Sequence, residues 1–509
     1  MEVSNSNQRL ITNTIYLYGR MILILFISVY TTRLVLKALG VVDFGIYNVV
    51  CGFVSIFSFL TVSLSNAIQR FYNYEKGKKQ NSIVRVFNTA LVMQIFLAIV
   101  VLVFVEPVGV WYINNVMVIP PERILTANFI FQFSIVSLVL VVLQAPFSAA
   151  VIAYEKMGYF AVVSLIDAIL KLILVCVLIV VSGDKLLLYG IIILLISILN
   201  FLAYFLYVRI ILNEISINFS WDKKLLKSML SFSGWNIVET LAHTLKGQGV
   251  NVILNLFFGP VINTANGIAT QTGDYLKGFS QNVITAFRPQ LVQSYAQGNN
   301  SRVKKMMFSM SKFSYAMMLA LVIPIIVEVN YILAIWLGES SVTDYMPAFV
   351  ILCLIFTTIS TLNPPLTQVV HATGSLRKYQ LTCAVIVGLI VPLSWLSLKL
   401  GFSPLYVYFV TILMTIVNQI ASVIILNKIF PFNILDYIRA VVFPCLIMSL
   451  LCPLPSFAIK YCMAPSLFRL ALVTLTSLIV CFFVFYFFVI NKDEREMLRS
   501  YLYSKLKRS

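Results

Sequence analysis

Residues 186–211 read LLLYGIIILLISILNFLAYFLYVRII, an almost unbroken apolar run in which Arg209 is the single charged side chain. An α-helix rises 1.5 Å per residue, so about 20 apolar residues cross the roughly 30 Å hydrocarbon core of a bilayer. Lipid offers no hydrogen bonds to the backbone, which leaves the helix as the structure in which such a run can cross. The stretch therefore predicts a transmembrane helix.

Runs of this kind recur along the whole chain of 509 residues. We count fourteen of them, over residues 13–38, 44–69, 86–107, 124–150, 160–181, 186–211, 230–258, 263–287, 308–337, 347–370, 380–400, 405–427, 437–459 and 467–490. Charged residues make up 11% of the chain, against roughly 25% in soluble domains. With 21 Gly and 17 Pro, the composition also excludes a disordered or collagen-like chain. The sequence predicts an all-α polytopic membrane protein with about 14 transmembrane helices.

Two of these runs contain residues that bend helices. The run 230–258 carries three glycines, and the run 308–337 carries Pro324 with Glu328 four residues later. Glycine and proline are the usual causes of sharp kinks, and neighbouring helices tolerate them in membranes. We therefore expect both spans to be bent or broken, with a candidate hinge at Glu328.

The charges of the connections indicate the orientation of the chain. Alternate connections, together with the two ends, hold 24 Lys and Arg residues on one side and seven on the other. Loops rich in Lys and Arg stay in the cytoplasm, so both termini are predicted to be cytoplasmic. The start of the chain is polar and lacks a cleavage site, so the first run is expected to stay as a helix. The net charge of +18 is distributed as short clusters at helix ends, which indicates contact with phospholipid headgroups and argues against nucleic-acid binding.

The sequence repeats itself after about 220 residues. The matching landmarks are Gly40 with Gly259, Arg70 with Arg288, Gly77 with Gly298, residues 144–146 (QAP) with residues 363–365 (NPP), and Tyr159 with Tyr379. This offset spans six helices, so the two copies share one orientation and form a parallel repeat. We predict two pseudo-symmetric six-helix lobes, over residues 1–215 and 216–430, followed by two C-terminal helices in 431–509. Transporters of this kind bind substrate between the lobes.

Ionisable residues inside the spans are the main candidates for function, because each costs roughly 2.5–3.5 kcal/mol to insert. They are Arg20 in the first span; Glu239, His243 and Lys246 in the seventh; Asp274 and Lys277 in the eighth; and Asp167 and Lys171 in the fifth. Spacings of three and four residues place the members of each group on one helical face. For Asp167 and Lys171 we favour an internal ion pair. For the other groups a pairing that merely permits insertion is the alternative to a functional role.

Charged residues near helix ends are interpreted as membrane contacts. Arg33, Lys37 and Asp43 lie near the outer end of the first span and are expected to snorkel to the interface. The repeat-related Arg70 and Arg288 lie near inner ends, where the positive-inside rule accounts for them. Contact with phospholipid phosphate, or gating of a cavity, is the alternative for this pair.

Aromatic and sulfur-containing side chains follow the same logic. An interfacial belt is predicted from Trp111, Trp221, Trp336 and Trp395. The eight cysteines form no CxxC pair and are interpreted as small buried residues, with oxidation of Cys452 and Cys462 across an outer loop as an alternative. With only two histidines, His243 and His371, no metal-binding cluster of His and Cys is predicted.

Several helix-end patterns resemble a known family. They are residues 39–48 (LGVVDFGIYN), 57–60 (FSFL), 63–71 (SLSNAIQRF) and 153–159 (AYEKMGY). They resemble bacterial polysaccharide flippases, the O-antigen and capsule exporters of the multidrug/oligosaccharidyl-lipid/polysaccharide exporter superfamily. The resemblance covers the first twelve helices. It implies an inner-membrane flippase that moves undecaprenyl-diphosphate-linked oligosaccharide from the cytoplasmic to the periplasmic leaflet by alternating access.

This function assigns roles to the intramembrane charges. A diphosphate needs cations inside a wet cavity, and Arg20, Lys246 and Lys277 are the predicted substrate-binding residues. Glu239, Asp274 and His243 are the candidates for ion coupling, with H⁺ or Na⁺ as the coupling ion and no other cofactor expected. The lipid-linked oligosaccharide and membrane phospholipids are the expected partners, and other membrane proteins of glycan assembly are candidate partners. The last two helices are expected to line a groove for the isoprenoid tail or simply to pack against lipid.

Two other functions fit a polytopic basic protein. A polysaccharide polymerase or ligase needs a sizeable periplasmic loop with catalytic acids, and the longest outer connection here, about residues 109–123, has no suitable acid pair. A cation-coupled multidrug exporter of the same superfamily favours an apolar pocket, fewer cations and twelve helices. The sequence therefore favours the flippase, and an enzyme is not predicted.

Overall fold

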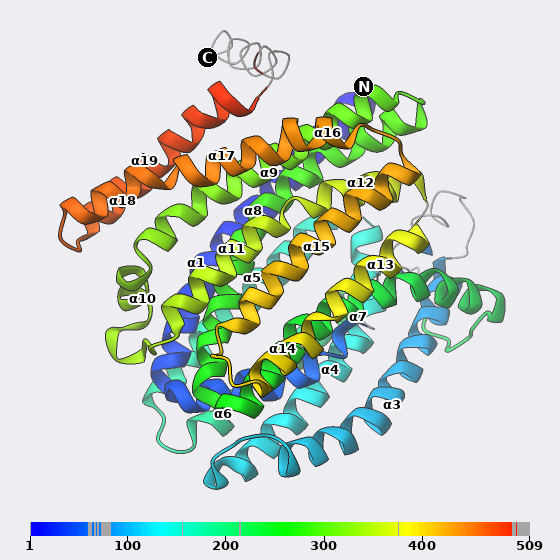
Figure 1. The fold of residues 1–509 in the computed structure, drawn as a ribbon. Coiled ribbons are helices and arrows are strands. Elements are labelled where there is room, and N and C mark those ends of the chain that lie inside the picture. Colours follow the sequence, from blue (N-terminus) through cyan, green and yellow to red (C-terminus); the bar gives the residue numbers. More distant parts are fainter. Residues whose placement is uncertain are drawn as a thin grey trace. The chain divides into compact units, whose positions relative to one another are not determined.

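A computed structural model describes residues 2–59, 64–65, 68, 71–72, 83–154, 156–212, 215–374, 376–490 and 495 (Figure 1). Within these residues, side chains are described except at 2–22, 153, 157, 231–236, 238–239, 282, 285–286, 289, 296 and 376. The described chain is helical and contains no strand. The all-α fold class predicted from the apolar runs is therefore confirmed.

The helices follow the predicted spans closely. In chain order they are α1 (Glu2–Ser55), α3 (Ile83–Asn115), α4 (Ile124–Ala153), α5 (Met157–Val180), α6 (Lys185–Ile210), α7 (Lys223–Phe258), α8 (Pro260–Ala296), α9 (Asn300–Val327), α10 (Val329–Leu337), α11 (Met346–Ser360), α12 (Asn363–Thr373), α13 (Leu376–Gly388), α14 (Ile390–Lys399), α15 (Tyr406–Ile429), α16 (Ile434–Tyr437), α17 (Phe443–Leu451), α18 (Pro453–Cys462) and α19 (Leu467–Val484). Short 3-10 turns occur at η1 (Pro121–Arg123) and η2 (Glu339–Ser341), and π-helices at η3 (Ile438–Val442) and η4 (Phe485–Val489).

Eleven helical segments of the described chain are long and apolar enough to cross a membrane. One of them, Leu23–Ser55, contains a break at Gly40. The helices α7 and α8, of 36 and 37 residues, are long enough to cross but are more polar than the eleven. If the two sides of Gly40 are counted as separate spans and α7 and α8 are included, the total agrees with the prediction of about 14 spans.

The chain divides into two compact units. Unit 1 comprises Met1–Thr264 together with Trp336–Ser341, and unit 2 comprises Ala265–Ile335 together with Val342–Ser509. Unit 1 thus joins the helices of the first repeat to α7, the first residues of α8 and a short segment from the second repeat. The division into lobes at residues 215 and 430 stays a prediction.

Two repeat-related glycines have the same backbone conformation. Gly40 breaks α1 with φ 78° and ψ 173°, and Gly259 separates α7 from α8 with φ 74° and ψ −171°. A positive φ is strained for residues with a Cβ, which accounts for glycine at both positions. The two residues are 219 positions apart, so this landmark of the predicted parallel repeat is confirmed in the geometry.

One of the two expected helix breaks is present. The run around Pro324 divides into α9 and α10 at Glu328, as expected for a proline that removes a backbone donor. The glycine-containing run is not broken, because α7 continues through it without interruption. Glycine costs only about 1 kcal/mol within a helix, too little to break a helix that is packed along its length.

The last helices of unit 2 pack against α9 (Figure 1). At the end of η4, the Nζ of the fully buried Lys312 on α9 donates to the carbonyl of Val489 at 3.3 Å. At the C-terminal end of α9, Glu328 forms a buried ion pair with Arg469 of α19, and both residues are more than nine-tenths buried. Lys312 satisfies a carbonyl that a helix C-terminus leaves without an intrahelical donor. Polar contacts therefore attach the C-terminal helices at the middle and at the C-terminal end of α9.

The connection between α6 and α7 is held along the start of α3. The side-chain Nδ2 of buried Asn88 donates to the carbonyl of Ser216 at 2.8 Å, and its Oδ1 accepts from the amide of Asn218 at 2.8 Å. The hydroxyl of Thr89 accepts from the amide of Asp222 at 3.1 Å. Asn88 and Thr89 thus supply the hydrogen bonds that this irregular segment would otherwise lack.

Two interpretations of individual residues are corrected. Cys452 and Cys462 lie at opposite ends of α18, about 15 Å apart by helical rise, which is too far for a disulfide. The Cys452 side chain instead contacts that of Cys481 on α19. Trp336 differs from the other three predicted belt tryptophans, because it is half-buried and its indole N–H donates to the carbonyl of Val29 at 2.7 Å.

Candidate functional site

The middle of α7, in unit 1, carries three of the predicted site residues. Because α7 is continuous, the spacings of four and three place Glu239, His243 and Lys246 on one face of the helix. The side chain of His243 is exposed and that of Lys246 is half-buried, whereas the side chain of Glu239 lies outside the described part. The predicted juxtaposition of an acid and two bases on α7 therefore holds at the level of the backbone.

A second group surrounds Asp274 on α8, in unit 2. Its carboxylate lies within electrostatic range of the hydroxyl of Tyr408 on α15, and this hydroxyl donates to Oδ1 of Asn266 at 2.8 Å. Gly273 permits the approach of α11, because a Cβ there would lie 3.0 Å from the hydroxyl of Thr357. An exposed acid within electrostatic range of a hydroxyl on another helix can take up a proton. The sequence did not indicate Tyr408, since it approaches Asp274 from a helix distant along the chain.

The same helix carries two exposed cations. Lys277 follows Asp274 by three residues, and Arg288 follows Lys277 by eleven, which is just over three full turns. The three side chains therefore start from one face of α8, with the two cations about 16 Å apart along the helix. His371 of α12 lies within electrostatic range of Arg288. The face of α8 thus combines one acid with a row of bases.

Two predicted residues are not described by the structure. Arg20 belongs to the helical backbone of α1, but its side chain lies outside the described part. Arg70, the gating and headgroup candidate related to Arg288, also lies outside the described residues. Their roles stay predictions.

The fifth-span charges form the predicted internal ion pair. The Nζ of Lys171 lies 2.9 Å from Oδ2 of Asp167, one turn away on α5. The amide of Asn200 on α6 donates to the other carboxylate oxygen at 2.5 Å. The carboxylate of Asp167 is thus paired on both oxygens within unit 1, which confirms the structural interpretation.

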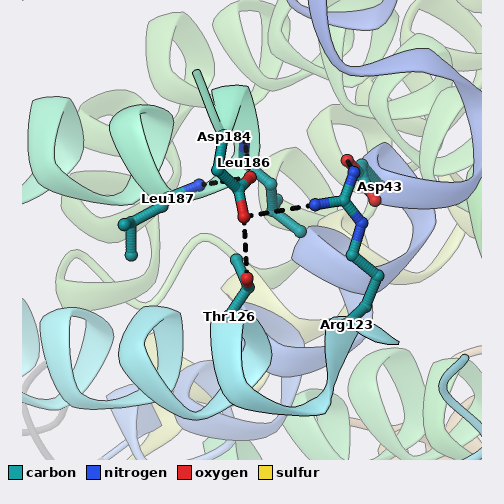
Figure 2. Close-up of polar contacts among 6 residues, drawn as sticks. All are labelled: Asp43, Arg123, Thr126, Asp184, Leu186 and Leu187. Carbon is teal, nitrogen blue, oxygen red and sulfur yellow. Dashed lines mark hydrogen bonds and ion pairs between the residues drawn. The ribbon is translucent and has the colours of Figure 1, made fainter. Parts of the chain in front are cut away.

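An ionic cluster at the predicted periplasmic end of unit 1 was not foreseen (Figure 2). The guanidinium of Arg123, the last residue of η1, lies 2.9 Å from the carboxylate of Asp43 and 3.2 Å from that of Asp184. The hydroxyl of Thr126 donates to Asp184 at 2.8 Å. Asp43 is therefore a buried ion-pair partner, and the expectation that it snorkels was wrong. Arg33 and Lys37 are exposed, in agreement with the expectation that they snorkel to the interface.

The pKa of Asp184 follows from these contacts. Burial raises its pKa, but the hydrogen bonds from Thr126 and from the amides of Leu186 and Leu187, together with the Arg123 charge, hold the pKa below its usual value (Figure 2). A carboxyl whose pKa is lowered by folding stabilises the protein above its unfolded pKa, about 3.9 for Asp, and loses that contribution as the pH falls through the folded value. The cluster is therefore intact at neutral pH.

The pH dependence of unfolding tests this cluster. In detergent, we expect Asp184→Asn to lower the thermal unfolding midpoint by the same amount throughout pH 5 to 7. Below about pH 4 the difference from the wild-type protein should shrink, because the unfolded state then binds a proton at Asp184 that the folded state does not bind until the pH falls through its lower pKa. A difference that grows on acidification would contradict the lowered pKa. Asn114→Ala, an exposed polar change on α3, provides the control.

The fold is that of known membrane transporters. The structure matches the lipid II flippase MurJ in an inward closed conformation with a TM-score of 0.62 at 15% identity, covering 93% of this chain and 98% of that one. It also matches an inward-facing multidrug resistance MATE family transporter of the MOP superfamily, with a TM-score of 0.62 at 14% identity, covering 81% of this chain and 94% of that one. An outward-facing MATE transporter matches with a TM-score of 0.60 at 13% identity, covering 82% and 96%.

No family model and no curated protein matches the sequence. The structural matches nevertheless agree with the superfamily that the helix-end patterns resemble. The chain is a multi-pass membrane protein with the fold shared by MurJ and MATE transporters.

Proposed function

We propose that the protein is a flippase that carries undecaprenyl-diphosphate-linked oligosaccharide from the cytoplasmic to the periplasmic leaflet of the bacterial inner membrane. The observation that carries this proposal is the extent of the match to the lipid II flippase MurJ, which includes 98% of that chain. The match covers 93% of this chain, against 82% for the outward-facing MATE transporter. The difference is about 56 residues, which equals the length of the segment 434–489 that forms the last two spans.

The charges on α7 and α8 suit such a substrate. A diphosphate inside a membrane protein needs cations, and Lys246 and Lys277 supply them from helices of the second repeat, with Arg20 supplying a third from α1. Asp274 is the preferred site for a coupling H⁺ or Na⁺, since it is an acid within a long helix and the hydroxyl of Tyr408 on α15 lies within its electrostatic range. Glu239 and His243 are the alternative coupling groups on α7. Arg70 and Arg288 are proposed to contact the phospholipid headgroups at the cytoplasmic ends, where both termini are predicted to lie.

A second candidate is a cation-coupled multidrug exporter. The MATE matches favour it, with TM-scores up to 0.62. A drug pocket is apolar and needs few fixed cations, whereas the exposed face of α8 presents both Lys277 and Arg288. The fixed cations on this helix therefore support the anionic lipid-linked substrate over a cationic drug.

Complementation of a deletion strain tests the proposal. Loss of the gene is expected to abolish the surface glycan and to accumulate the lipid-linked precursor on the cytoplasmic side. In the strains complemented with Lys246→Ala or Arg20→Ala, the surface glycan should reach less than one tenth of the wild-type level. Each substitution removes one of the cations that bind the diphosphate. The surface glycan is measured on gels, and the lipid-linked precursor is measured by mass spectrometry. The variants are compared at equal abundance in the membrane.

The control is Lys171→Ala, since the ion pair of this residue with Asp167 has a structural role. It should restore the glycan fully. Full restoration by both Lys246→Ala and Arg20→Ala would contradict the site. Unchanged glycan with increased drug sensitivity in the deletion strain would favour the exporter.

A further inference from the structure

The segment that joins α6 to α7 lies where two spans of unit 1 have their predicted cytoplasmic ends. The span of α6 ends at Ile210, and the span of α3 begins at Ile83. Asn88 and Thr89, in the first two turns of α3, hold residues 216–222 by three hydrogen bonds. The positive-inside rule places both of these span ends on the cytoplasmic side. The segment is therefore attached at the predicted cytoplasmic surface of the bilayer.

Two large aromatic side chains of this segment are exposed. Phe219 is 62% exposed, and Trp221, one of the predicted belt tryptophans, is 60% exposed. Contact between large apolar surfaces and water is unfavourable, whereas the membrane–water interface favours aromatic rings at the level of the headgroups. The two rings are therefore suited to the surface of the bilayer.

The backbone of Phe219 is strained. Its φ of 49° lies in the left-handed region, and no other non-glycine residue of the described chain has a positive φ. A bulky residue rarely adopts this conformation, which persists only where the surroundings fix it. Here the amides of Asn218 and Asp222, on either side of Phe219, both donate to side chains of α3. Because the strained residue leaves its ring mostly exposed, the strain gains little packing within the protein and indicates an external contact.

Three lysines follow the aromatic pair at the start of α7. Lys223, Lys224 and Lys227 are all exposed, and they lie within the first five residues of the helix. This spacing places them within about 6 Å of each other along the helix axis. Arg85 of α3 is a further exposed cation, but it forms an ion pair with Asp222. The three lysines thus form a compact positive patch beside the two rings.

The start of a helix is an unfavourable place for cations, because the helix dipole is positive there. The first turn of α7 nevertheless contains no acidic residue. The amides of Lys224 and Leu225 already donate to Oδ1 of Asp222, at 2.7 and 2.9 Å. The ammonium groups of the lysines, and not these helix amides, are therefore the groups that can bind an anion.

We infer that residues 216–227 form a binding site for an anionic phospholipid of the cytoplasmic leaflet. The three lysines bind the phosphate of the headgroup, and the rings of Phe219 and Trp221 lie beside the glycerol and the first carbons of the acyl chains. Cations close to an anionic leaflet attract its headgroups, and this attraction decays within a Debye length. A zwitterionic headgroup carries an ammonium group of its own, which the lysines repel. The site therefore selects lipids that have a net negative charge.

The aromatic rings distinguish a phospholipid from a soluble anion. Inorganic phosphate or an acidic protein surface would bind the lysines but would leave Phe219 and Trp221 in water. A ligand that contacts both groups needs an anionic head joined to an apolar part, as in a phospholipid. The inference does not depend on the proposed cargo, because none of these residues is assigned to the diphosphate.

Fluorescence quenching by brominated lipids tests the site. The full chain is placed in phosphatidylcholine nanodiscs that contain equal fractions of either brominated phosphatidylglycerol or brominated phosphatidylcholine. The difference between the wild-type protein and Trp221→Phe gives the contribution of Trp221. We expect phosphatidylglycerol to quench this contribution about twofold more strongly than phosphatidylcholine. Equal quenching by the two lipids would overturn the inference.

Removing the three charges tests the lysines. The variant that combines Lys223→Gln, Lys224→Gln and Lys227→Gln should lose the preference for phosphatidylglycerol when Trp221 is measured in the same way. Its unfolding midpoint in detergent should be unchanged, because all three side chains are exposed. A preference that persists in this variant would assign the lipid to other cations and contradict the site.

Trp395 provides the matched control. It is 42% exposed, and the Nζ of Lys399 lies 4.7 Å from the centroid of its ring, so it combines an exposed tryptophan with a single lysine. Its contribution, obtained with Trp395→Phe, should be quenched equally by the two lipids. A preference of the same size at Trp395 would contradict a specific site at Trp221. Loss of the Trp221 preference with inorganic pyrophosphate, but not with sodium chloride of equal ionic strength, would indicate a soluble anion as the ligand.

Phe219→Gly separates a role in the membrane from a role in the fold. Glycine adopts a positive φ without strain, so the unfolding midpoint in detergent should stay the same or rise. In nanodiscs, quenching of Trp221 by both brominated lipids should fall, because one of the two rings at the interface is removed. A lower midpoint in detergent would show that the ring packs against the protein and would contradict its contact with lipid. None of these measurements uses the cargo, so an error in the proposed function would leave their outcomes unchanged.

Discussion

Glu328→Ala is expected to destabilise the protein by about 3–5 kcal/mol, because it leaves the charge of Arg469 buried without its partner. The two side chains form an ion pair with exposures of 1% for Glu328 and 7% for Arg469. Arg469 would then keep only its hydrogen bond to the carbonyl of Met463. The loss should appear as a lower unfolding midpoint in detergent, measured by thermal shift and by retained monomer on size-exclusion chromatography.

Two comparisons identify burial as the cause. Lys171→Ala removes one member of an ion pair whose side chains are 41% and 23% exposed, and it should cost less than about 1 kcal/mol. The double variant Glu328→Leu with Arg469→Leu removes both buried charges and should recover most of the loss, because apolar residues can replace a buried pair. An equal loss in the single and double variants would show that the shape of the side chains matters and their charge does not.

Gly45→Ala is expected to cost about 1–3 kcal/mol through overpacking. Its new methyl group would overlap the carbonyl of Pro260, and a backbone atom cannot move aside as the end of a flexible side chain can. The helices must separate locally, which also stretches the hydrogen bond from Thr264 to Val41. The measurement is again the unfolding midpoint of the purified protein in detergent.

Gly247→Ala on α7 is the matched control, since a Cβ there meets no atom within 4 Å. A helix gains up to about 1 kcal/mol when alanine replaces glycine in its interior. The two substitutions should therefore shift the midpoint in opposite directions. A loss of similar size at both positions would argue against close contact at Gly45.

Hydropathy predicted the helices well, because crossing the membrane constrains length and polarity together. The predicted run 405–427 became Tyr406–Ile429, and the run 186–211 became Lys185–Ile210. The repeat was predicted from a few landmarks, and the matching φ values of Gly40 and Gly259 confirm one of them. The continuous α7 was missed because glycine weakens a helix locally, whereas packing along the whole helix decides whether it breaks.

Partners from distant segments set the limit of the sequence analysis. The burial of Asp43 depends on Arg123, 80 residues further along, and the hydrogen bond of Trp336 reaches back 307 residues to Val29. The residue pattern within a single helix cannot predict a contact between residues so far apart in the sequence. The spacing of Glu239, His243 and Lys246 could be predicted because a single helix determines it. The proximity of Tyr408 to Asp274 could not, since it joins α15 to α8.

The hydrogen bonds of Asn88 and Thr89 have a consequence for movement. They attach residues 216–222 to α3, so this part of the connection between the repeats is expected to move together with α3. A displacement of α7 relative to α3 must therefore begin after Asp222, in the first turn of α7.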